Sequence, residues 1–502
     1  MTTAASSVTT SPVTTALFIG GKERHTAEMM AIADPAKPGV VVGHAASASA
    51  QDVRDAVAAA KAAYPGWAAL TPQQRAGKML AALSGIDGAN RDADAAILSQ
   101  ENGKIRFEAW VDSLVLELRW KLALGHADEV NAAKVLPPIP GAIPVQTTVA
   151  YQPLGVVTII VPFNWPVAIL GAALPQALLA GNTVIVKPPL TAPLATTRIV
   201  ERIAKQLPPG VLNVVTGPDA NMSALIRNPD VAKVCFTGSV NGGKKMMELA
   251  SQSLTRVTLE LGGNDAAIVL QDAILDDVHL DRMFAAIYDT TGQICMNAKR
   301  LFVHESRVDE VVKGLSARLQ KVKLGYGLDK DTTMGPLHSP AQKTFVESLI
   351  KEAKESGATV LEFGELPGGD MKGGNFVRPA IVVNPKLNLR VVTEEQFGPV
   401  IPVIPFETEE EAIRMANDTW AGLAGSVWTA DPKTANRVGG QMVCGYVWVN
   451  DHGATRLDLR APFGGMKASG IGREQGIEGV RAFQDTRSIA HLDAATLATM
   501  HH

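Results

Sequence analysis

The sequence has only three cysteines among its 502 residues, at positions 235, 295 and 444. They are far apart and form no CxxC pair, which argues against a disulfide framework and a cysteine-based zinc site. We therefore expect no metal centre. An isolated thiol survives in a reducing compartment, so this composition favours a cytoplasmic protein.

The sequence also lacks a basic excess and an unbroken apolar run. Its formal net charge is −3, whereas nucleic-acid-binding domains usually carry a basic surface, so we expect no nucleic-acid partner. The longest apolar stretch, 156–186, is interrupted by Pro162, Pro166 and Pro175, which favours buried strands and helices over a membrane span. Residues 1–16 lack the basic and apolar segments of an export signal, and we predict a disordered tail there.

Alternating strand and helix patterns make up much of the chain. Between residues 156 and 260, short runs rich in Val, Ile and Thr alternate with segments of helical periodicity. This alternation predicts a parallel sheet with right-handed crossovers, which binds nucleotides at the carboxyl ends of its strands. Helices are also expected at 50–63, 71–83 and 105–130. Because the alternation resumes after residue 263, we predict an α/β protein with a Rossmann-like parallel-sheet cofactor domain and a second α/β domain.

The chain contains a thiol and a carboxylate that could form a covalent catalytic site. Cys295 follows Thr-Gly-Gln-Ile, and Glu260 begins the segment Glu-Leu-Gly-Gly. A thiolate can form a covalent intermediate, and a carboxylate can activate the water that discharges it. Any long protein has a cysteine and a glutamate at some spacing, so the pairing gains meaning only from the segments around it.

Three predicted strand ends carry groups suited to a cofactor or an oxyanion. Gly238 and Ser239 end one strand and Gly243 opens a helix. The free N–H groups at a helix start favour a phosphate, although such a turn more often only connects a strand to a helix. Lys187 ends another strand and could reach ribose hydroxyls or a phosphate, although most lysines are solvated. Asn164 follows a third strand; it could donate to an oxyanion or form a polar turn.

These motifs together resemble those of the NAD(P)-dependent aldehyde dehydrogenase superfamily along nearly the whole chain from about Leu17. The matching blocks occur in family order: PFNWP at 162–166, VKPP at 186–189, FTGS with a later glycine at 236–243, ELGG at 260–263, GQICMNAKR at 292–300, EEQFGPV at 394–400 and PFGGMKASGIGRE at 462–474. The resemblance implies an enzyme that oxidises an aldehyde to a carboxylic acid.

The resemblance also implies roles for individual residues. Cys295 matches the nucleophile, Glu260 the general base and Asn164 the oxyanion donor beside the backbone N–H of Cys295. The cofactor would be bound by Lys187 and Glu395 at the riboses, Phe397 near the nicotinamide, Ser239 at the pyrophosphate, and Gly238 and Gly243, which shape that turn.

The resemblance further implies a division of the chain. A dinucleotide-binding domain would comprise residues 17–130 and 148–262, and a catalytic domain residues 263–482. An oligomerisation arm would comprise residues 131–147 and 483–502, which implies a homodimer or homotetramer.

One position departs from the family pattern. After VKP the family commonly has a small residue and then a glutamate that binds the adenosine ribose, but here Pro189 and Leu190 follow. A carboxylate there would repel the 2′-phosphate of NADP, and Leu190 does not, while Lys187 could pair with that phosphate. The cofactor is therefore expected to be NAD or NADP, with measurable activity with both.

The substrate is suggested by the residues around the catalytic groups. Trp165, Ile294 and Met296 flank them, and Ala172 occupies a place that the family often fills with an aromatic residue. A smaller residue there predicts a roomier apolar pocket for an aromatic or medium-chain aldehyde. Arg456 and Arg460 favour a semialdehyde that carries a carboxylate instead, but exposed loop arginines are usually solvated.

Two other functional classes remain alternatives. A member that transfers the acyl group to coenzyme A typically lacks the carboxylate that Glu260 supplies, and a non-catalytic structural member would not need the set of Cys295, Glu260 and Asn164. The remaining candidate groups are interpreted as structural. Cys235 and Cys444 are expected to be packing residues, and His304 is not expected to pair with Cys295 as in a cysteine protease. His452 is expected to form part of a loop turn rather than of the substrate entrance.

Overall fold

The computed structural model describes residues 12–86, 88–139, 142–143 and 145–500. Residues 1–11 of the predicted tail lie outside this part of the chain. Val13–Thr15 form strand β1, which pairs in parallel with β5 (Val41–Ala46); β5 also pairs with β4 (Met29–Ala33). The prediction of disorder up to residue 16 is therefore wrong at its end, because Thr15 and Ala16 are buried.

The first unit is built on an eight-stranded mixed sheet. In spatial order its strands are β22 (Gly470–Ile471), β12 (Arg256–Glu260), β11 (Val231–Thr237), β8 (Val156–Ile160), β9 (Thr183–Lys187), β10 (Leu212–Val214), β2 (Leu17–Ile19) and β3 (Lys22–Arg24). The five strands from β12 to β10 are parallel, as predicted. Their Val- and Ile-rich sequences suit strands that are covered on both faces.

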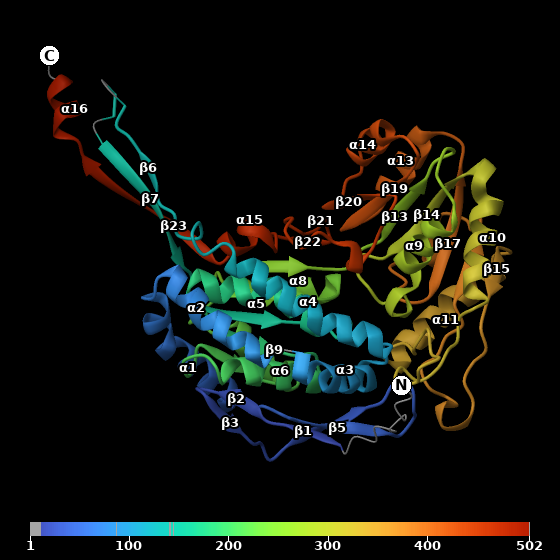
Figure 1. Cartoon of the computed structure of the whole chain (residues 1–502), viewed down its shortest axis with the longest axis horizontal. Helices are drawn as coiled ribbons and strands as arrows, with labels where there is room; N and C mark the ends of the chain where they lie inside the picture. The colour runs from blue at the N-terminus through green and yellow to red at the C-terminus, as the bar shows by residue number, and fades with distance from the viewer. Residues whose placement is uncertain (1–11, 87, 140–141, 144, 501–502) are drawn as a thin grey trace, which may run out of the picture.

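Helices cover both faces of this sheet (Figure 1). One face carries α5 (Pro166–Ala180) and α6 (Leu194–Ala204), with α2 (Pro72–Ala82), α3 (Gly88–Asn102) and α4 (Arg106–Leu124) packed over them; the other carries α1 (Ala50–Ala68), α7 (Asp219–Ile226) and α8 (Val240–Ser251). After β10 the chain crosses to the far side of β8 and adds β11 there. The winding therefore reverses between β8 and β11, and open α/β sheets bind ligands at such a switch point.

Local sequence signals explain where several of these helices begin and end. Ser49 and Thr71 cap α1 and α2, each accepting a hydrogen bond from the backbone N–H three residues later, and Pro72 occupies the first turn of α2. Gly181 ends α5 in the left-handed conformation with φ of 104°. Helix α4 ends at Leu124, six residues before the predicted end at 130.

The second unit has a seven-stranded sheet. In spatial order its strands are β15 (Thr359–Glu362), β16 (Ala380–Val383), β17 (Val400–Phe406), β14 (Ala298–His304), β13 (Asp265–Val269), β19 (Ala424–Trp428) and β20 (Tyr446–Val449), of which only β15 is antiparallel to its neighbour. One face packs on α9 (Asp277–Tyr288) and α10 (Val308–Leu319), and the other on α11 (Pro340–Glu355), α12 (Arg390–Thr393), α13 (Glu409–Asn417) and α14 (Pro432–Gly439). A two-stranded ribbon joins β18 (Ala421–Gly422) to β21 (Met466–Lys467).

An arm projects from the first unit (Figure 1). Its three-stranded antiparallel sheet contains β6 (Lys134–Leu136), β7 (Val145–Pro153) and β23 (Gln484–Leu492), and α16 (Ala494–Thr499) follows β23. The sheet is largely exposed to solvent. The arm strand β7 extends to residue 153, so the predicted arm boundary at 147 lies six residues too early.

The boundary predicted at residue 482 also needs correction. Strand β22 pairs with β12 in the first sheet, and α15 (Gly476–Arg481) packs against α4 and α5. The chain therefore returns to the first unit by residue 470. Helical periodicity and strand runs cannot show this return, because it depends on pairing between distant segments. No helix in the described part of the chain is long and apolar enough to cross a membrane.

Candidate active site

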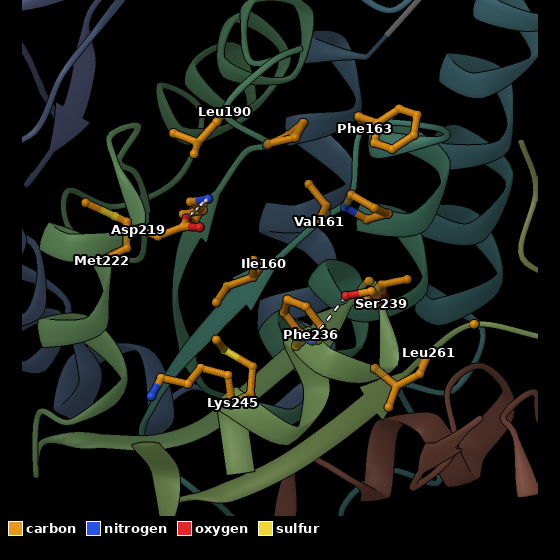
Figure 2. A pocket seen from close by; sticks show the side chains of 18 of the residues that line it. Ile160, Val161, Phe163, Leu190, Asp219, Met222, Phe236, Ser239, Lys245 and Leu261 are labelled. Atoms are coloured by element: carbon orange, nitrogen blue, oxygen red, sulfur yellow. Dashed lines mark hydrogen bonds and ion pairs between the residues drawn. The ribbon is translucent and has the colours of Figure 1, made fainter. Parts of the chain in front are cut away.

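A cavity of about 880 Å³ opens at the switch point of the first sheet (Figure 2). Its walls come from the segments that follow β8, β9 and β11, from α7 and α8, and from two loops of the second unit. Of the residues predicted from sequence, the cavity is lined by Asn164, Lys187, Gly238, Ser239, Cys295, Glu395 and Phe397. The tertiary structure thus brings together strand ends that are far apart in the sequence.

The turn before α8 presents a helix N-terminus to the cavity. Ser239 caps the helix and its hydroxyl accepts a hydrogen bond from the backbone N–H of Gly242 at 3.1 Å. A Cβ at Gly238 would lie 2.5 Å from the Phe236 ring, so glycine is required there. Gly242 lines the cavity, whereas Gly243 packs on Leu261, where a Cβ would lie 2.5 Å from Cδ1 of that side chain.

Lys187 has a carboxylate partner that the sequence did not reveal. Its Nζ lies 3.1 Å from Oδ1 of Asp219, at the start of α7, and both residues line the cavity beside Leu190 (Figure 2). The side chain of Asp219 is 82% exposed, whereas that of Lys187 is 8% exposed. A carboxylate is thus present near Leu190 although residue 190 itself is apolar.

Glu395 and Phe397 approach the cavity from the second unit. Oε1 of Glu395 accepts a hydrogen bond from the backbone N–H of Gly263 at 3.2 Å. Phe397 has a φ of 46°, a left-handed conformation that bulky residues rarely adopt, and its ring meets Phe163 edge-on at 6.0 Å. Phe163 in turn stacks on His338 at 3.9 Å, which fixes this wall of the cavity.

The segment before Cys295 is strained. Thr290 and Thr291 both have left-handed backbones, with φ of 53° and 57°, and such conformations cost on the order of 1–3 kcal/mol each for β-branched residues. Their buried contacts hold them there. The backbone N–H of Thr290 donates to Glu108 at 2.6 Å, its hydroxyl accepts from the indole of Trp165 at 3.0 Å, and the Thr291 hydroxyl donates to the Gly335 carbonyl at 3.0 Å. The surrounding structure therefore determines this loop.

Cys295 lies in the loop between the 3₁₀ helix η2 (Asp289–Gly292) and β14, facing the cavity. Nδ2 of Asn164 donates to the carbonyl of Gln293 at 2.9 Å, which ties the segment after β8 to this loop. The backbone N–H of Cys295 makes no hydrogen bond to another described residue. Asn164 and Cys295 both line the cavity, so the Asn164 amide and the backbone N–H of Cys295 are candidate donors to an oxyanion formed there.

Burial makes the Cys295 thiol difficult to ionise. It raises the pKa of Cys295 to about 12, while the nearby ammonium of Lys299 lowers it and the carboxylates of Glu395, Asp265 and Glu260 raise it. The reactive form of a cysteine is the thiolate. The balance of these charges therefore controls how reactive the thiol is.

Glu260 is buried at the carboxyl end of β12 and has an unusual environment. Neither carboxyl oxygen has a hydrogen-bond partner among the described residues. Burial raises the pKa of Glu260 well above its ordinary value, Glu474 raises it further, and Arg473 opposes both. The carboxyl group lies against Gly464, where a Cβ would come within 2.9 Å of Oε1. Glu260 does not line the cavity in this arrangement.

Glu474 is a second buried carboxyl in this region. Burial raises its pKa to about 7, against the opposing charges of Arg119 and Lys233. Glu260 therefore has a second buried acid as its neighbour. Sequence reasoning missed Glu474, because only the return of residues 470–482 to the first unit places it near Glu260.

An apolar cluster packs on the other side of Cys295. Its buried members are Trp165, Ala168, Ile294, Met296, Leu423, Ala424, Trp448, Leu457 and Phe463, and half-buried residues including Val111, Val115, Ile169 and Tyr446 pack against it. Three of the four predicted pocket residues belong to this cluster. Ala172 does not; it is buried elsewhere along α5.

The other groups considered from sequence have ordinary structural roles. Arg456 and Arg460 already have carboxylate partners, Asp451 at 3.8 Å and Asp458 at 2.7 Å. His452 is buried, where its ring nitrogens bond Ser426 and the Met296 carbonyl, and burial lowers its pKa to about 3. It is therefore a packing group beneath the loop rather than part of a substrate entrance.

The remaining cysteines and His304 do not form a second site. Cys235 is buried within β11, and burial raises its pKa to about 12. Cys444 is half-buried and its thiol donates to the Tyr446 carbonyl at 3.5 Å. His304 ends β14, the strand that begins near Cys295, and bonds Ser306 instead.

Comparison with known proteins identifies the class to which this fold and site belong. A model of the aldehyde dehydrogenase family matches residues 22–489. A betaine aldehyde dehydrogenase of Bacillus subtilis (strain 168) is 34% identical over 444 residues, covering 88% of this chain and 89% of that protein.

Solved structures agree with this assignment. A betaine aldehyde dehydrogenase from Staphylococcus aureus, in complex with NAD⁺, superposes with a TM-score of 0.89 at 32% identity and covers 95% of both chains. An Escherichia coli NADP-dependent enzyme gives a TM-score of 0.90 at 32% identity, over 95% of this chain and 98% of that chain. The chain belongs to the aldehyde dehydrogenase family, and it is an oxidoreductase. The predicted family and α/β fold are thereby confirmed.

Proposed function

We propose that the protein oxidises an aldehyde to the carboxylic acid with NAD or NADP through a thioester on Cys295. The observation that carries the proposal is the convergence of Cys295, Asn164 and the turn at Ser239 on one cavity, with Glu260 buried beside them. In this proposal the first unit binds the dinucleotide, and the second unit supplies the nucleophile. We also propose a cytoplasmic location, because an isolated nucleophilic thiol survives best in a reducing compartment.

The residues of the site suit each step of this reaction. The Cys295 thiolate attacks the aldehyde carbon, and the Asn164 amide and the Cys295 backbone N–H stabilise the oxyanion. A nicotinamide held beside Phe397 would supply the acceptor for the hydride that leaves the adduct on Cys295, and the product on Cys295 would be a thioester. Glu260 then removes a proton from the water that hydrolyses the thioester.

The groups around the cavity fit a dinucleotide. The N-terminus of α8, open at Ser239 and Gly242, suits a pyrophosphate. Lys187 and Glu395 are placed to bond ribose hydroxyls, and Phe397 can cover a nicotinamide ring. The relatives whose structures contain NAD⁺ or whose names specify NADP support either dinucleotide here.

The substrate is expected to carry an apolar or aromatic group. The ring of Tyr446 lies 4.6 Å from that of Trp448 and 6.2 Å from that of Phe463, and all three belong to the cluster that packs on Cys295. The loop arginines that would favour an anionic semialdehyde are already paired. Such rings also bind quaternary ammonium groups, so betaine aldehyde is included among the test substrates.

A panel of aldehydes tests the proposal. Purified protein is given benzaldehyde, hexanal, betaine aldehyde or succinic semialdehyde with either cofactor, and the absorbance of the reduced nicotinamide is followed. We expect the highest kcat/KM for benzaldehyde or hexanal. No reduction with any aldehyde would contradict the reaction, and the highest kcat/KM with succinic semialdehyde would contradict the substrate class.

The same assay distinguishes hydrolysis from acyl transfer. Glu260 favours hydrolysis, so we expect the free acid as product and no acceleration by coenzyme A. Formation of an acyl-coenzyme A would instead support the acylating alternative. A protein that binds NAD but reduces it with no aldehyde would support a non-catalytic role.

The arm is proposed to join subunits into a homodimer or homotetramer. Its apolar residues include Val135 and Leu492, 55% and 63% exposed, which is costly for an isolated subunit. Light scattering of the full chain should give the mass of a dimer or tetramer, and a monomer would contradict this proposal.

A further inference from the structure

Lys299 is a buried lysine beneath the Cys295 loop. It is the second residue of β14 and is 2% exposed. Its Nζ donates to the carbonyl oxygens of Ile294 and Cys295, both at 2.7 Å, and to that of Asn297 at 3.3 Å. One ammonium group therefore holds three carbonyl groups of a four-residue segment that includes the predicted nucleophile.

The same ammonium is joined to Glu395. The distance between Lys299 Nζ and Glu395 Oε1 is 3.6 Å, and the side chain of Glu395 is 19% exposed. Glu395 Oε1 also accepts a hydrogen bond from the backbone N–H of Gly263. The nucleophile loop and the segment of the second unit that carries Glu395 therefore share one charged contact.

The thiol is surrounded by charges of both signs. Three carboxylates act on it: Glu395, Asp265 on β13 and Glu260 on β12. The cations that interact with it are Lys299 and, from α4, Arg119. A buried anion is strongly disfavoured unless a cation compensates for it, and the Lys299 ammonium is bonded directly to the loop that carries Cys295.

We propose that Lys299 is a positioning residue that holds the Cys295 loop in its reactive conformation and places a buried positive charge beside the nucleophile, with Glu395 as its counter-ion. The inference rests on the proposed function only in taking Cys295 as the nucleophile. Lys299 is a positioning residue rather than a catalytic one, because it does not line the cavity and acts through the Cys295 loop.

The ionisation of Cys295 tests this role without any cofactor. The rate at which iodoacetamide alkylates Cys295 is measured against pH, with the modified peptide identified by mass spectrometry so that Cys235 and Cys444 are counted separately. Below its titration midpoint a thiol is alkylated about tenfold more slowly for each unit by which that midpoint rises. We expect Lys299→Gln and Lys299→Met to slow alkylation about tenfold or more at fixed pH.

Three further variants should leave the alkylation rate of Cys295 nearly unchanged or increase it. Lys299→Arg keeps the charge and should stay within about threefold of the wild type, whereas Glu395→Gln removes an opposing charge and should accelerate alkylation. Lys343→Met is a matched control, since Lys343 also donates to a backbone carbonyl, that of Gly374 at 3.0 Å. It should leave Cys295 reactivity unchanged.

Specific outcomes would overturn the proposal. A folded Lys299→Gln protein, checked by circular dichroism, that alkylates at the wild-type rate would leave Lys299 with a structural role only. If Lys299→Met does not fold, the comparison of Lys299→Gln with Lys299→Arg and the response of Glu395→Gln still decide. By contrast, full alkylation of wild-type Cys295 without loss of aldehyde oxidation would refute the proposed function, whatever the Lys299 variants show.

Discussion

The two sides of Cys295, proposed for the cofactor and for the substrate, are built in different ways. On the proposed cofactor side, a cavity of about 880 Å³ is framed by strand ends of the first sheet and by segments of the second unit, and it contains charged and small residues such as Lys187 and Ser239. On the substrate side, aromatic and aliphatic side chains from α4, α5, β20 and the loop at 457–463 pack into a cluster. The first region depends on backbone geometry that short motifs encode, and the second on side chains that meet only after folding.

The nucleophile lies between the two regions, and its removal should have the largest effect. Cys295→Ala should reduce turnover to below about a hundredth of the wild-type value, because no covalent intermediate can form. NAD affinity, measured by titration calorimetry, should change little because the thiol is one small part of the cavity wall. A variant with more residual turnover than this would remove Cys295 from the mechanism.

The Glu260→Gln variant should separate the two half-reactions. A burst of reduced nicotinamide should remain in stopped-flow absorbance, followed by steady turnover that is about 10²–10⁴ times slower, since a general base typically contributes that much. Loss of both phases in a folded protein that still binds NAD would assign Glu260 to an earlier step.

The raised pKa of Glu260 gives the same step a pH dependence. The carboxyl group must lose its proton to act as a base, and burial raises its pKa, so wild-type steady turnover should increase with pH over a range above that of an ordinary carboxyl group. This dependence should disappear in Glu260→Gln, and a wild-type rate that falls over the same range would contradict the assigned role.

The cofactor side can be altered at Leu190. We expect wild-type activity with both NAD and NADP, and Leu190→Glu should shift the ratio of kcat/KM towards NAD about tenfold or more, which corresponds to about 1.4 kcal/mol. Leu190→Gln has nearly the same shape without charge and serves as the control. An unchanged ratio in Leu190→Glu would indicate that Asp219, which pairs with Lys187 in the same cavity, already decides the preference.

The substrate side can be altered at Tyr446, where a smaller effect is expected. Tyr446→Ala should lower kcat/KM for benzaldehyde severalfold to about tenfold, because lost aromatic contacts are worth about 0.5–1.5 kcal/mol each. The KM for NAD should stay unchanged, and Phe107→Ala, a change at a residue 69% exposed on α4, serves as the control. Equal losses for benzaldehyde and acetaldehyde would contradict a role in substrate contact.

The division of the chain into two α/β units was predictable because local patterns of apolar residues indicate the strands and helices of each unit. The parallel strands from β8 to β12 and the helices between them match the runs of apolar residues in the sequence. The limits of the arm were less predictable. Strand β7 continues to Pro153 only because β23, more than 300 residues later, pairs with it along its whole length.

The candidate site shows the same contrast. Cys295, Glu260, Asn164, Lys187 and Ser239 stand in recognisable motifs, so the sequence alone identified the family and these candidate residues. These motifs can be recognised from the sequence alone because each depends on the residues of a single turn or strand end. By contrast, Gly242 lines the cavity while Gly243 packs on Leu261, and this distinction depends on how the first turn of α8 packs against the neighbouring segment.

Only the tertiary structure decided which charges surround the thiol. Lys299 lies four residues after Cys295, yet its contact with Glu395 depends on the packing of β14 beside a loop almost a hundred residues away. Glu474 approaches Glu260 because β22 returns to the first sheet, and Asp219 approaches Lys187 because α7 follows β10. Electrostatic interactions depend on distance and burial, which the order of residues does not specify. The sequence alone therefore determined the class of chemistry, and the folded chain determined the charges and the burial that set the pKa values of its groups.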